Sequence, residues 1–520
     1  MPRVLTAEEA VKDYIYDGAT IATSGFVGAV HAETISAAVQ KLFLETGHPR
    51  DLTLMWAAGQ GDSGEKGLNH FGEEGLLKCG IGGHWGLQPR MQKLALENKF
   101  AAYNLPQGVI SHMFRDIAAA KVGVITHVGL NTFVDPRLEG GKLNEKAREM
   151  GDIVEVINIE GKDLLMYKTR PVDVAIIRAT FADEKGNCTM HKEGVFSEAL
   201  SIAMAAKNSG GKVIVEVEQL VAYGSLDPRL VKIPGAYIDA IVVAENPFET
   251  HKMTNGSYFN PAFTGEVRIP VDRVAPLPMG DRKIIARRAA MELVPDALVN
   301  LGIGMPEGVA TICAEEGLKG MVLTTESGTI GGVPAAGGDF GVTINPDCVL
   351  DQPYQFDFYD GGGLDVAFLG LAQTDKVGNI NVSKFGPKIA GCGGFINITQ
   401  NSRKVVYCGT FTTGGLKVHV EDNKLVIDQE GKVKKFVDTV EQITFSGKYA
   451  ARIGQPVLYI TERAVFKLGH DGVELIEVAP GIDIQTQILD QMDFRPIIKG
   501  TPKTMDTRIF SENLMGLSLE

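Results

Sequence analysis

The sequence lacks the features of membrane and nucleic-acid-binding proteins. No run approaches the roughly 18 apolar residues needed to cross a bilayer, and the N-terminal stretch has no signal-peptide apolar region. Acidic residues outnumber basic residues, 64 to 51, which gives a formal net charge of −13 and a pI of about 5.4. Such a balance argues against nucleic acid or an anionic membrane as the main partner. We therefore expect a cytoplasmic protein that binds neither nucleic acid nor membrane.

Several motifs of metal and nucleotide chemistry are also missing. The six cysteines form no CxxC, which excludes zinc ribbons and thioredoxin-like sites; we expect buried, reduced thiols. No GxxxxGK[ST], HExxH or GxSxG occurs. His84, His112 and His127 have no partner at metal-ligand spacing, so we expect them to be structural or to support other side chains. The sequence therefore predicts no metal site.

Glycine, in contrast, is abundant. It accounts for 61 of 520 residues, well above the usual 7% or so, and it clusters after apolar runs, as in tight turns at strand ends. The apolar runs are rich in Val and Ile, and they alternate with helical patterns. Many are apolar on both faces, which suits parallel strands covered by helices on both sides. We predict an α/β protein with largely parallel sheets, and its length indicates two domains.

The chain also repeats itself. Val172–Asn187, VDVAIIRATFADEKGN, aligns with Leu364–Asn379, LDVAFLGLAQTDKVGN, and both share an aspartate followed by Gly-Asn. Asp17–Phe26 aligns in the same order with Asp296–Met305. Chance similarity between Val-rich strands is the alternative. We interpret the pattern as two homologous halves fused in one chain.

A plausible linker separates the halves. Glu266–Lys283 contains three prolines and shows no clear periodicity. We place the domains at residues 1–275 and 276–520. The second half should then open with a helix in DRKIIARRAAMELV, and the alternating pattern near the C-terminus predicts an antiparallel addition.

One glycine pattern resembles a nucleotide-binding turn. Leu301–Gly308, LGIGMPEG, follows a strand and opens a helix, one residue off the dinucleotide fingerprint. A phosphate at that helix N-terminus is physically reasonable. Glycines that merely permit tight packing, and a hydride-transferring enzyme, are the alternatives.

A lone carboxylate is the sharper signal. In Val322–Gly338, VLTTESGTIGGVPAAGG, Glu326 stands where an apolar strand gives way to a glycine-rich loop. Burying it would cost free energy without hydrogen bonds, and small neighbours leave room for a ligand. A solvated loop glutamate or a local cap is the other interpretation.

Further glycine clusters favour a site. They follow strand-like runs in both halves, and their backbone N–H groups can converge around one carboxylate. Such convergence is the geometry of a nucleophile served by oxyanion holes. The clusters are Thr23–Ala29, Leu105–Val109, Tyr359–Asp365 and Ala390–Phe395.

These stretches resemble the family I coenzyme A transferases, most closely the propionate (short-chain acyl) CoA-transferases. The resemblance covers nearly the whole chain and is most specific in ESGTIGGVPAAGG, YQFDFYDGGGLDVAFLGLAQTDKVGNINVSKFG, IAGCGGFINITQ and CGTFTTGGLK. It implies two homologous α/β domains, the first alpha-subunit-like and the second beta-subunit-like. It also implies a homodimer or homotetramer.

The resemblance further implies roles for individual residues. Glu326 corresponds to the family's nucleophile, Gly362 and Gly363 to an oxyanion hole, and Gln107 to a contact with the reacting carbonyl or carboxylate. The residues expected to bind CoA or the acyl group are Gly25, Phe26, Gly28, Gly302, Gly304 and Gly394. The chain departs from the family's usual G-G-F-x-x-x-G-x-P, because Ser24 opens the motif and Ala32 or Glu33 stands near the proline position.

The implied reaction moves CoA between short-chain carboxylic acids by a ping-pong route through a glutamyl-CoA thioester on Glu326. Acyl-CoA and short-chain carboxylates are then the partners, and no cofactor is needed, since CoA is a substrate. An acyl-CoA hydrolase on the same scaffold is the alternative. A non-catalytic binding protein is disfavoured, because a sensor has no need of the nucleophile.

Overall fold

The structure is a computed structural model that describes residues 1–270 and 276–519. Its contacts divide the chain into two compact units. The first contains Met1–Ile269, Thr325–Asp357 and Phe385–Asn397, and the second Pro270–Thr324, Phe358–Lys384 and Ile398–Glu520. The predicted boundary between 275 and 276 falls at the edge of residues 271–275, which lie outside the described ranges. It stays a prediction.

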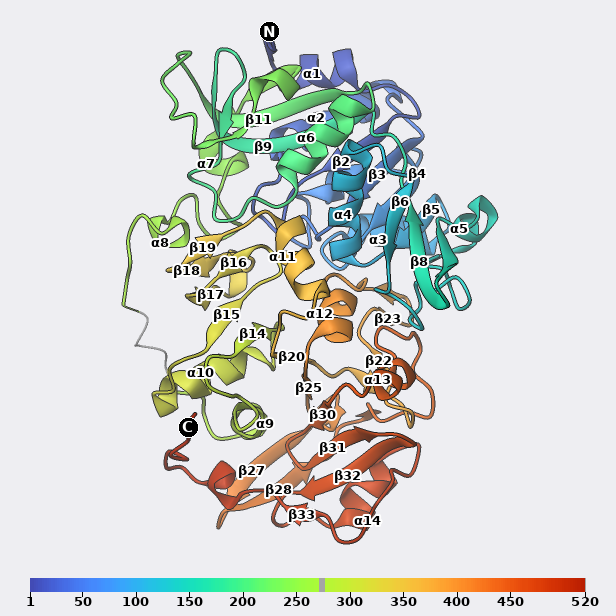
Figure 1. Ribbon diagram of the computed structural model, residues 1–520, viewed down its shortest axis with the longest axis vertical. Helices are drawn as coiled ribbons and strands as arrows, with labels where there is room; N and C mark the ends of the chain where they lie inside the picture. The colour runs from blue at the N-terminus through green and yellow to red at the C-terminus, as the bar shows by residue number, and fades with distance from the viewer. Residues whose placement is uncertain (271–275, 520) are drawn as a thin grey trace. The chain divides into compact units, whose positions relative to one another are not determined.

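The first unit is built on a parallel sheet (Figure 1). Along its main path the strands follow the order β1-β13-β11-β9-β2-β3-β4-β5, and each neighbouring pair is parallel. Their bounds are β1 (Arg3–Leu5), β13 (Ala240–Val243), β11 (Lys212–Val221), β9 (Val174–Asp183), β2 (Thr20–Thr23), β3 (Leu52–Trp56), β4 (Leu77–Gly82) and β5 (Ala101–Asn104). Nearly every residue of β9 is buried, as expected for a strand covered on both faces.

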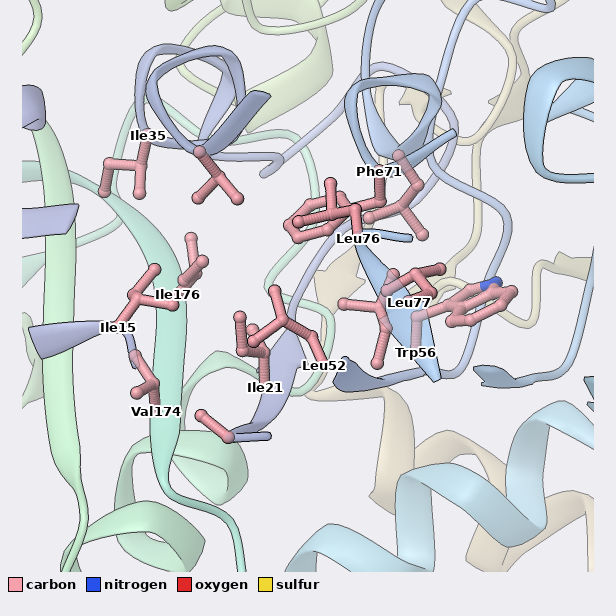
Figure 2. Close-up of a cluster of buried hydrophobic side chains, with 14 of the residues drawn as sticks. Ile15, Ile21, Ile35, Leu52, Trp56, Phe71, Leu76, Leu77, Val174 and Ile176 are labelled. Atoms are coloured by element: carbon pink, nitrogen blue, oxygen red, sulfur yellow. The ribbon is translucent and has the colours of Figure 1, made fainter. Parts of the chain in front are cut away.

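Helices cover this sheet. Their bounds are α1 (Ala7–Tyr14), α2 (Glu33–Thr46), α3 (Pro89–Leu96), α4 (Gln107–Ala118), α5 (Glu145–Met150), α6 (Ala199–Asn208), α7 (Pro247–Thr250) and α8 (Pro261–Thr264). Side chains of α1, α2 and α3 share one buried cluster with alternate residues of the sheet. Figure 2 shows part of it, with Ile35 above Ile176 and Trp56 beside Leu77. Removing these side chains from water is the main stabilisation of the unit.

The second unit carries its own sheet, in the order β15-β14-β20-β25-β30-β31-β32-β33. The bounds are β15 (Val322–Thr324), β14 (Leu298–Leu301), β20 (Val366–Gly370), β25 (Val405–Cys408), β30 (Val457–Ile460), β31 (Ala464–Gly469), β32 (Gly472–Val478) and β33 (Lys503–Thr504). From β15 to β30 the pairs are parallel, whereas β31 is antiparallel to both of its neighbours. The predicted α/β class and the predicted antiparallel addition near the C-terminus are both confirmed.

The remaining helices are α9 (Asp281–Ala290), α10 (Glu307–Glu316), α11 (Gln352–Asp360), α12 (Phe395–Asn401), α13 (Gly447–Ile453) and α14 (Ile484–Gln487). Helix α9 confirms the helix predicted to open the second half. Helix α10 follows β14 through the loop Gly302–Pro306, so the strand–loop–helix context predicted for LGIGMPEG is also present. Among the described residues, no helix is long and apolar enough to cross a membrane.

The smaller strands form hairpins and short sheets. Near Glu326 they are β16 (Thr329–Ile330), β17 (Val333–Pro334), β18 (Thr343–Ile344) and β19 (Cys348–Val349). Elsewhere they are β6 (Gly123–Thr126), β7 (Val154–Ile159), β8 (Lys162–Lys168), β10 (Cys188–Thr189), β12 (Val231–Ile233), β21 (Gln373–Thr374), β22 (Ile380–Asn381), β23 (Lys384–Phe385), β24 (Lys388–Ile389), β26 (Thr412–Thr413), β27 (Lys417–Glu421), β28 (Lys424–Gln429) and β29 (Val433–Lys434).

The predicted repeat is seen in the structure as the same hydrogen-bonded turn in both units. In the first unit, the Asn187 backbone N–H donates to Asp183 Oδ1 over 3.0 Å, and its side-chain amide donates to Oδ2 over 2.9 Å. In the second unit, Asn379 donates to Asp375 over the same two distances. The intervening glycines, Gly186 and Gly378, both have φ +84°. Two homologous halves account for this agreement better than chance does.

The second alignment of the repeat is wrong by one residue. It pairs Asp17 with Asp296, but β2 and β14 are in the same register when Gly18 is matched with Asp296. Both of these residues have positive φ, +78° and +55°. The Thr20 and Leu298 amides donate to equivalent aspartates, Asp173 and Asp365. An aspartate tolerates the left-handed conformation that glycine usually adopts. Asp296 therefore corresponds to Gly18 in the structure, and matching aspartate with aspartate gives the wrong alignment.

One apolar strand departs from the parallel pattern, and one expectation needs correction. The apolar run Lys121–Gly129 has the composition of a parallel strand, but it forms β6 in an antiparallel three-stranded sheet, β6-β8-β7. Burial alternates along β8 because this small sheet buries only one face. All six cysteines are free, but Cys348 is exposed rather than buried.

Candidate active site

Glu326 lies in a tight turn, as the sequence predicted. The turn follows β15 and leads into β16, and Glu326 is half-buried. The Thr325 N–H donates to Thr329 O over 3.0 Å, and the Gly328 N–H donates to Thr325 O over 3.1 Å. Backbone hydrogen bonds thus close the turn on both sides of the carboxylate.

A chain of hydroxyl groups fixes the turn further. Thr325 Oγ1 lies 2.7 Å from Ser327 Oγ and 2.6 Å from Thr329 Oγ1. The Ser327 hydroxyl donates to Gly341 O over 2.8 Å, and Thr329 Oγ1 meets Thr343 Oγ1 at 2.5 Å. Linked hydroxyls of this kind hold a short segment more firmly than isolated hydrogen bonds do. The small polar residues around Glu326 therefore serve to orient it.

Gly328 fits this turn as no other residue would. Its φ is +114°, and a Cβ there would lie 2.1 Å from Leu350 O. That oxygen belongs to the backbone, and the Leu350 N–H in turn donates to Gly328 O over 2.8 Å. Since the obstacle cannot rotate away, the turn beside Glu326 needs glycine for space as well as for conformation.

Gly328→Ala is therefore expected to lower the stability of the protein by more than about 3 kcal/mol, from backbone strain and the clash together. This corresponds to a fall of roughly 3–5 °C or more in the thermal unfolding midpoint. Gly337→Ala is the matched control, because Gly337 also has positive φ, +64°, but has open space around it; its cost should stay near 1 kcal/mol. Equal losses in the two variants would refute the steric argument.

The loop containing Gly25, Phe26 and Gly28 contacts the segment that follows Glu326. The rings of Phe26 and Phe340 have centroids 6.0 Å apart. A Cβ on Gly341 would lie 2.5 Å from the Phe26 ring. The Ser327 hydroxyl donates to Gly341 O. The segment Phe340–Gly341 therefore contacts both the predicted acyl-binding loop, through Phe26, and the turn that contains Glu326.

This loop is strained. Val27 and Val30 have φ +56° and +60°, which is unusual for β-branched residues, and strain of this kind is concentrated at functional sites. Gly28 is held against Asn255, whose Oδ1 would lie 2.3 Å from an added Cβ. The surrounding structure therefore fixes the backbone of the loop in a costly conformation, which favours a functional role for it.

A cavity of about 170 Å³ opens beside this loop. Gly28 and the buried side chains of His31 and Arg178 are part of its lining. The His31 Nδ1 hydrogen-bonds Gln60 Oε1 at 2.7 Å, and burial lowers the pKa of His31. Arg178 is paired with buried Glu193 through two 3.0 Å bonds. The cavity has room for a group of a few non-hydrogen atoms.

Gln107 begins helix α4 and meets the loop Ala390–Gly394. Its backbone N–H donates to Gly393 O over 2.9 Å, and the Gly393 N–H donates to Gly83 O over 2.8 Å. The Gln107 side-chain Nε2 is buried and has no hydrogen-bond partner among the described residues. Within the same part of the structure, the N–H groups of Gly391 and Gly394 donate to no backbone carbonyl. The Gln107 side-chain amide and the Gly394 backbone N–H therefore lie near each other, and both are available to donate hydrogen bonds to a ligand.

The other predicted site residues belong to the second unit. The Gly302 N–H donates to Phe368 O over 2.8 Å, and Gly304 O accepts from Arg282 over 2.9 Å. The N–H groups of Gly362 and Gly363 donate to Tyr359 O and Phe358 O, both over 3.0 Å. An oxyanion would have to compete for these two donors, which end helix α11. Their assignment stays a prediction.

The pairing of His84 with Gly391 could not be expected from the sequence. The Trp85 N–H donates to Ala390 O over 2.8 Å, and this joins the two segments. Both GGHWG and AGCGGF are visible as glycine clusters, but nothing in the sequence says that they pair. Burial, reinforced by Lys388, lowers the pKa of His84 to about 4, so its ring is neutral at pH 7.

Helix α4 also carries a buried acid contact. The Ser111 hydroxyl donates to Glu198 Oε1 over 3.1 Å, while Glu198 Oε2 is buried and unpartnered among the described residues. Burial raises the pKa of Glu198 to about 8. In an unfolded chain a glutamate titrates near pH 4.3.

Since the folded pKa of Glu198 is raised, its contribution to stability is present below about pH 4.3 and is lost as pH rises toward 8. Glu198→Gln keeps the acceptor for Ser111 but does not ionise. We expect the variant's thermal midpoint to exceed that of the wild type at pH 8 and to match it near pH 4. Parallel midpoint-versus-pH curves for the two proteins would contradict this.

Comparisons with known proteins identify close relatives. Residues 4–244 match a family model described as coenzyme A transferase. The chain is 48% identical to caffeate CoA-transferase of Acetobacterium woodii over 99% of both chains. It is 43% identical to acetate CoA-transferase YdiF of Escherichia coli (strain K12), over 99% of this chain and 96% of the other. A solved acyl-CoA transferase (YdiF) of E. coli O157:H7, in a thioester complex with CoA, superposes with a TM-score of 0.92 at 42% identity, covering 99% of this chain and 97% of that one.

Proposed function

The chain belongs to the coenzyme A transferase family, and on that premise we propose that it works through a covalent glutamyl-CoA thioester on Glu326. It is a CoA-transferase that moves CoA between carboxylic acids. The observation that supports Glu326 is its turn: a half-buried carboxylate held by linked hydroxyls beside a glycine that cannot be replaced. The solved E. coli relative is itself a thioester complex with CoA.

The first half-reaction needs no proton transfer. A Glu326 carboxylate oxygen attacks the acyl-CoA carbonyl carbon, the C–S bond breaks, and CoA leaves as a thiolate. The product is a mixed anhydride between Glu326 and the acyl group. The thiolate then attacks the Glu326 carboxyl carbon, the anhydride C–O bond breaks, and the acid leaves as its carboxylate. Glu326 now carries CoA as a thioester, and an incoming carboxylate reverses these steps.

Each half-reaction passes through anionic tetrahedral states, which need hydrogen-bond donors aimed at the developing negative charge. Gln107 and the Gly25–Gly28 loop supply one group of candidates in the first unit, and Gly362 and Gly363 are the candidates in the second. Water must be excluded, because it would hydrolyse the anhydride. Binding energy from the remote part of CoA would offset the weak nucleophilicity of a carboxylate.

We propose short-chain acids as the substrates, with acetate, propionate, butyrate, lactate and acrylate as candidates. The cavity of about 170 Å³ beside Gly28 is consistent with a small acyl group. One relative is named for acetate and another for the larger caffeate, so the identity of the acid must be measured. A homodimer or homotetramer remains our expectation for the assembly.

Initial-rate kinetics test the proposal. With acetyl- or propionyl-CoA and a short carboxylate both varied, a covalent intermediate predicts parallel double-reciprocal lines. Lines that intersect would contradict the ping-pong route. The hydrolase alternative predicts steady CoA release without any acceptor acid, whereas a transferase releases CoA to water only slowly.

A further inference from the structure

A side-chain amide from helix α11 holds the peptide group that precedes Glu326. Gln355 is fully buried, and its Nε2–H donates to Thr325 O over 3.1 Å. The same oxygen accepts the Gly328 N–H over 3.1 Å, which is the bond that closes the turn. The carbonyl before Glu326 is therefore held from two sides, once by its own turn and once by a helix.

The Gln355 hydrogen bond acts on Glu326 through the peptide plane. The Thr325 C=O and the Glu326 N–H belong to one planar group and point in opposite directions. Fixing the direction of Thr325 O therefore fixes the backbone from which the Glu326 side chain extends. The linked hydroxyls orient the side chains of the turn, whereas the Gln355 bond orients its main chain.

The first half of α11 is itself docked on helix α4. Three hydrogen bonds join the two helices, and each involves a different residue of α4: Gln352 Nε2 to Ser111 Oγ (3.2 Å), His112 Nε2 to Pro353 O (3.0 Å) and Arg115 Nη2 to Asp357 Oδ1 (2.9 Å). The residues of α11 up to Asp357 belong to the first unit, together with α4 and the Glu326 turn. Helix α11 therefore connects that turn to α4.

The connection reaches the start of α4, where Gln107 lies. The next residue, Gly108, packs against the ring of Phe356, and a Cβ added to it would lie 2.5 Å from that ring. Gln107 is the predicted contact to the reacting carbonyl. The same helix thus holds the turn of the proposed nucleophile and the first residues of the helix that supplies a hydrogen-bond donor.

We propose that Gln355 is a positioning residue: its bond to Thr325 O fixes the Glu326 turn to α11 and thereby places Glu326 with respect to Gln107. The inference rests on the proposed function. Gln355 acts through the turn and takes no part in bond making or breaking. Attack on a carbonyl needs the reacting atoms aligned at about 3–3.5 Å, and a misplacement of about 1 Å can cost roughly 100-fold in rate.

A neutral amide suits this position. A lysine or arginine could also donate to Thr325 O, but its positive charge would stabilise the neighbouring Glu326 carboxylate and make it a weaker nucleophile. Glutamine supplies the donor without that charge. The turn is therefore fixed while the carboxylate stays reactive.

Gln355→Met tests the inference, with Gln92→Met as its matched control. Methionine keeps the length of the glutamine side chain but donates no hydrogen bond. Trp85 O, like Thr325 O, accepts one backbone N–H and one glutamine side chain, over 3.1 and 2.8 Å. Each substitution removes one of two hydrogen bonds to a carbonyl, so both should lower the thermal midpoint by a similar amount.

The single-turnover rate of CoA loading onto Glu326 separates the two variants. It is measured with the full-length protein and saturating propionyl-CoA. We expect Gln355→Met to load about 10- to 100-fold more slowly than the wild type, with little change in KM, and Gln92→Met to load at the wild-type rate. Gln355→Asn should be as slow as Gln355→Met, because its amide is withdrawn by one methylene group from Thr325 O.

A purely structural role for Gln355 predicts other outcomes. Wild-type loading by Gln355→Met, equal slowing of loading in both methionine variants, or a change in KM instead of the loading rate would each overturn the inference. If Gln355→Met does not fold, Gln355→Asn is judged by the same criteria. A wild type that never loads CoA refutes the proposed function itself, so the two failures are distinguishable.

Discussion

Glu326→Gln is expected to abolish CoA transfer, lowering the rate on the order of 10⁴-fold or more, as removal of a covalent nucleophile does elsewhere. The amide has nearly the shape of the carboxylate, but it does not attack a thioester. The hydroxyls of Thr325, Ser327 and Thr329 bond to one another, so the turn should persist. The measurement is transfer from propionyl-CoA to acetate, together with the thermal midpoint.

Glu421→Gln provides the control for losing a carboxylate, because Glu421 is exposed in the hairpin β27–β28, in the other unit. It should retain full activity. If Glu326→Gln transferred CoA within tenfold of the wild type, Glu326 would not be the nucleophile, and the covalent route would have to be abandoned.

Gln107→Met is expected to have the second largest effect. Methionine matches the length of glutamine but donates no hydrogen bond, so the transfer rate should fall about 10²- to 10³-fold. Since Nε2 has no partner among the described residues, its loss removes an unsatisfied buried group. The stability of the unliganded protein should therefore stay the same or rise by about 1 kcal/mol.

Gln92→Met gives the opposite pattern. The buried Gln92 side chain donates to Trp85 O over 2.8 Å, and the Gln88 N–H donates to the same oxygen over 3.1 Å. This substitution removes one of these two hydrogen bonds in a buried place, so it should lower the thermal midpoint while transfer continues. If Gln107→Met lost stability and activity in the manner of a disrupted core, Gln107 would be a structural residue.

Local signals in the sequence predict much of the fold. The runs that form β9 and β11 are rich in Val and apolar on both faces, so the parallel sheet could be expected. In the Asp-x-x-Gly-Asn turns, the hydrogen bonds form between residues of the motif itself, so the repeated turn could be expected as well. The helix start at Thr6 is equally local, because Thr6 and Glu9 form a capping box. The place of β6 could not be predicted, since the partner of a short apolar strand depends on residues far along the chain.

The candidate site divides in the same way. Glu326 could be predicted because a carboxylate between small residues at a strand end has few structural uses. The pairing of His84 with Gly391 could not, since it joins segments far apart in the chain through backbone hydrogen bonds that any residue can make. Nor could the sequence show that the Gly362 and Gly363 amides are engaged at the end of α11.

The most direct test of the covalent route is the intact mass of the protein after mixing with propionyl-CoA in the absence of an acceptor acid. We predict a mass increase of one CoA less one water. Peptide mapping should place it on the segment containing Glu326, and added acetate should remove it. An adduct on another residue, or no adduct and no CoA release with several short acyl-CoAs, would contradict the central claim.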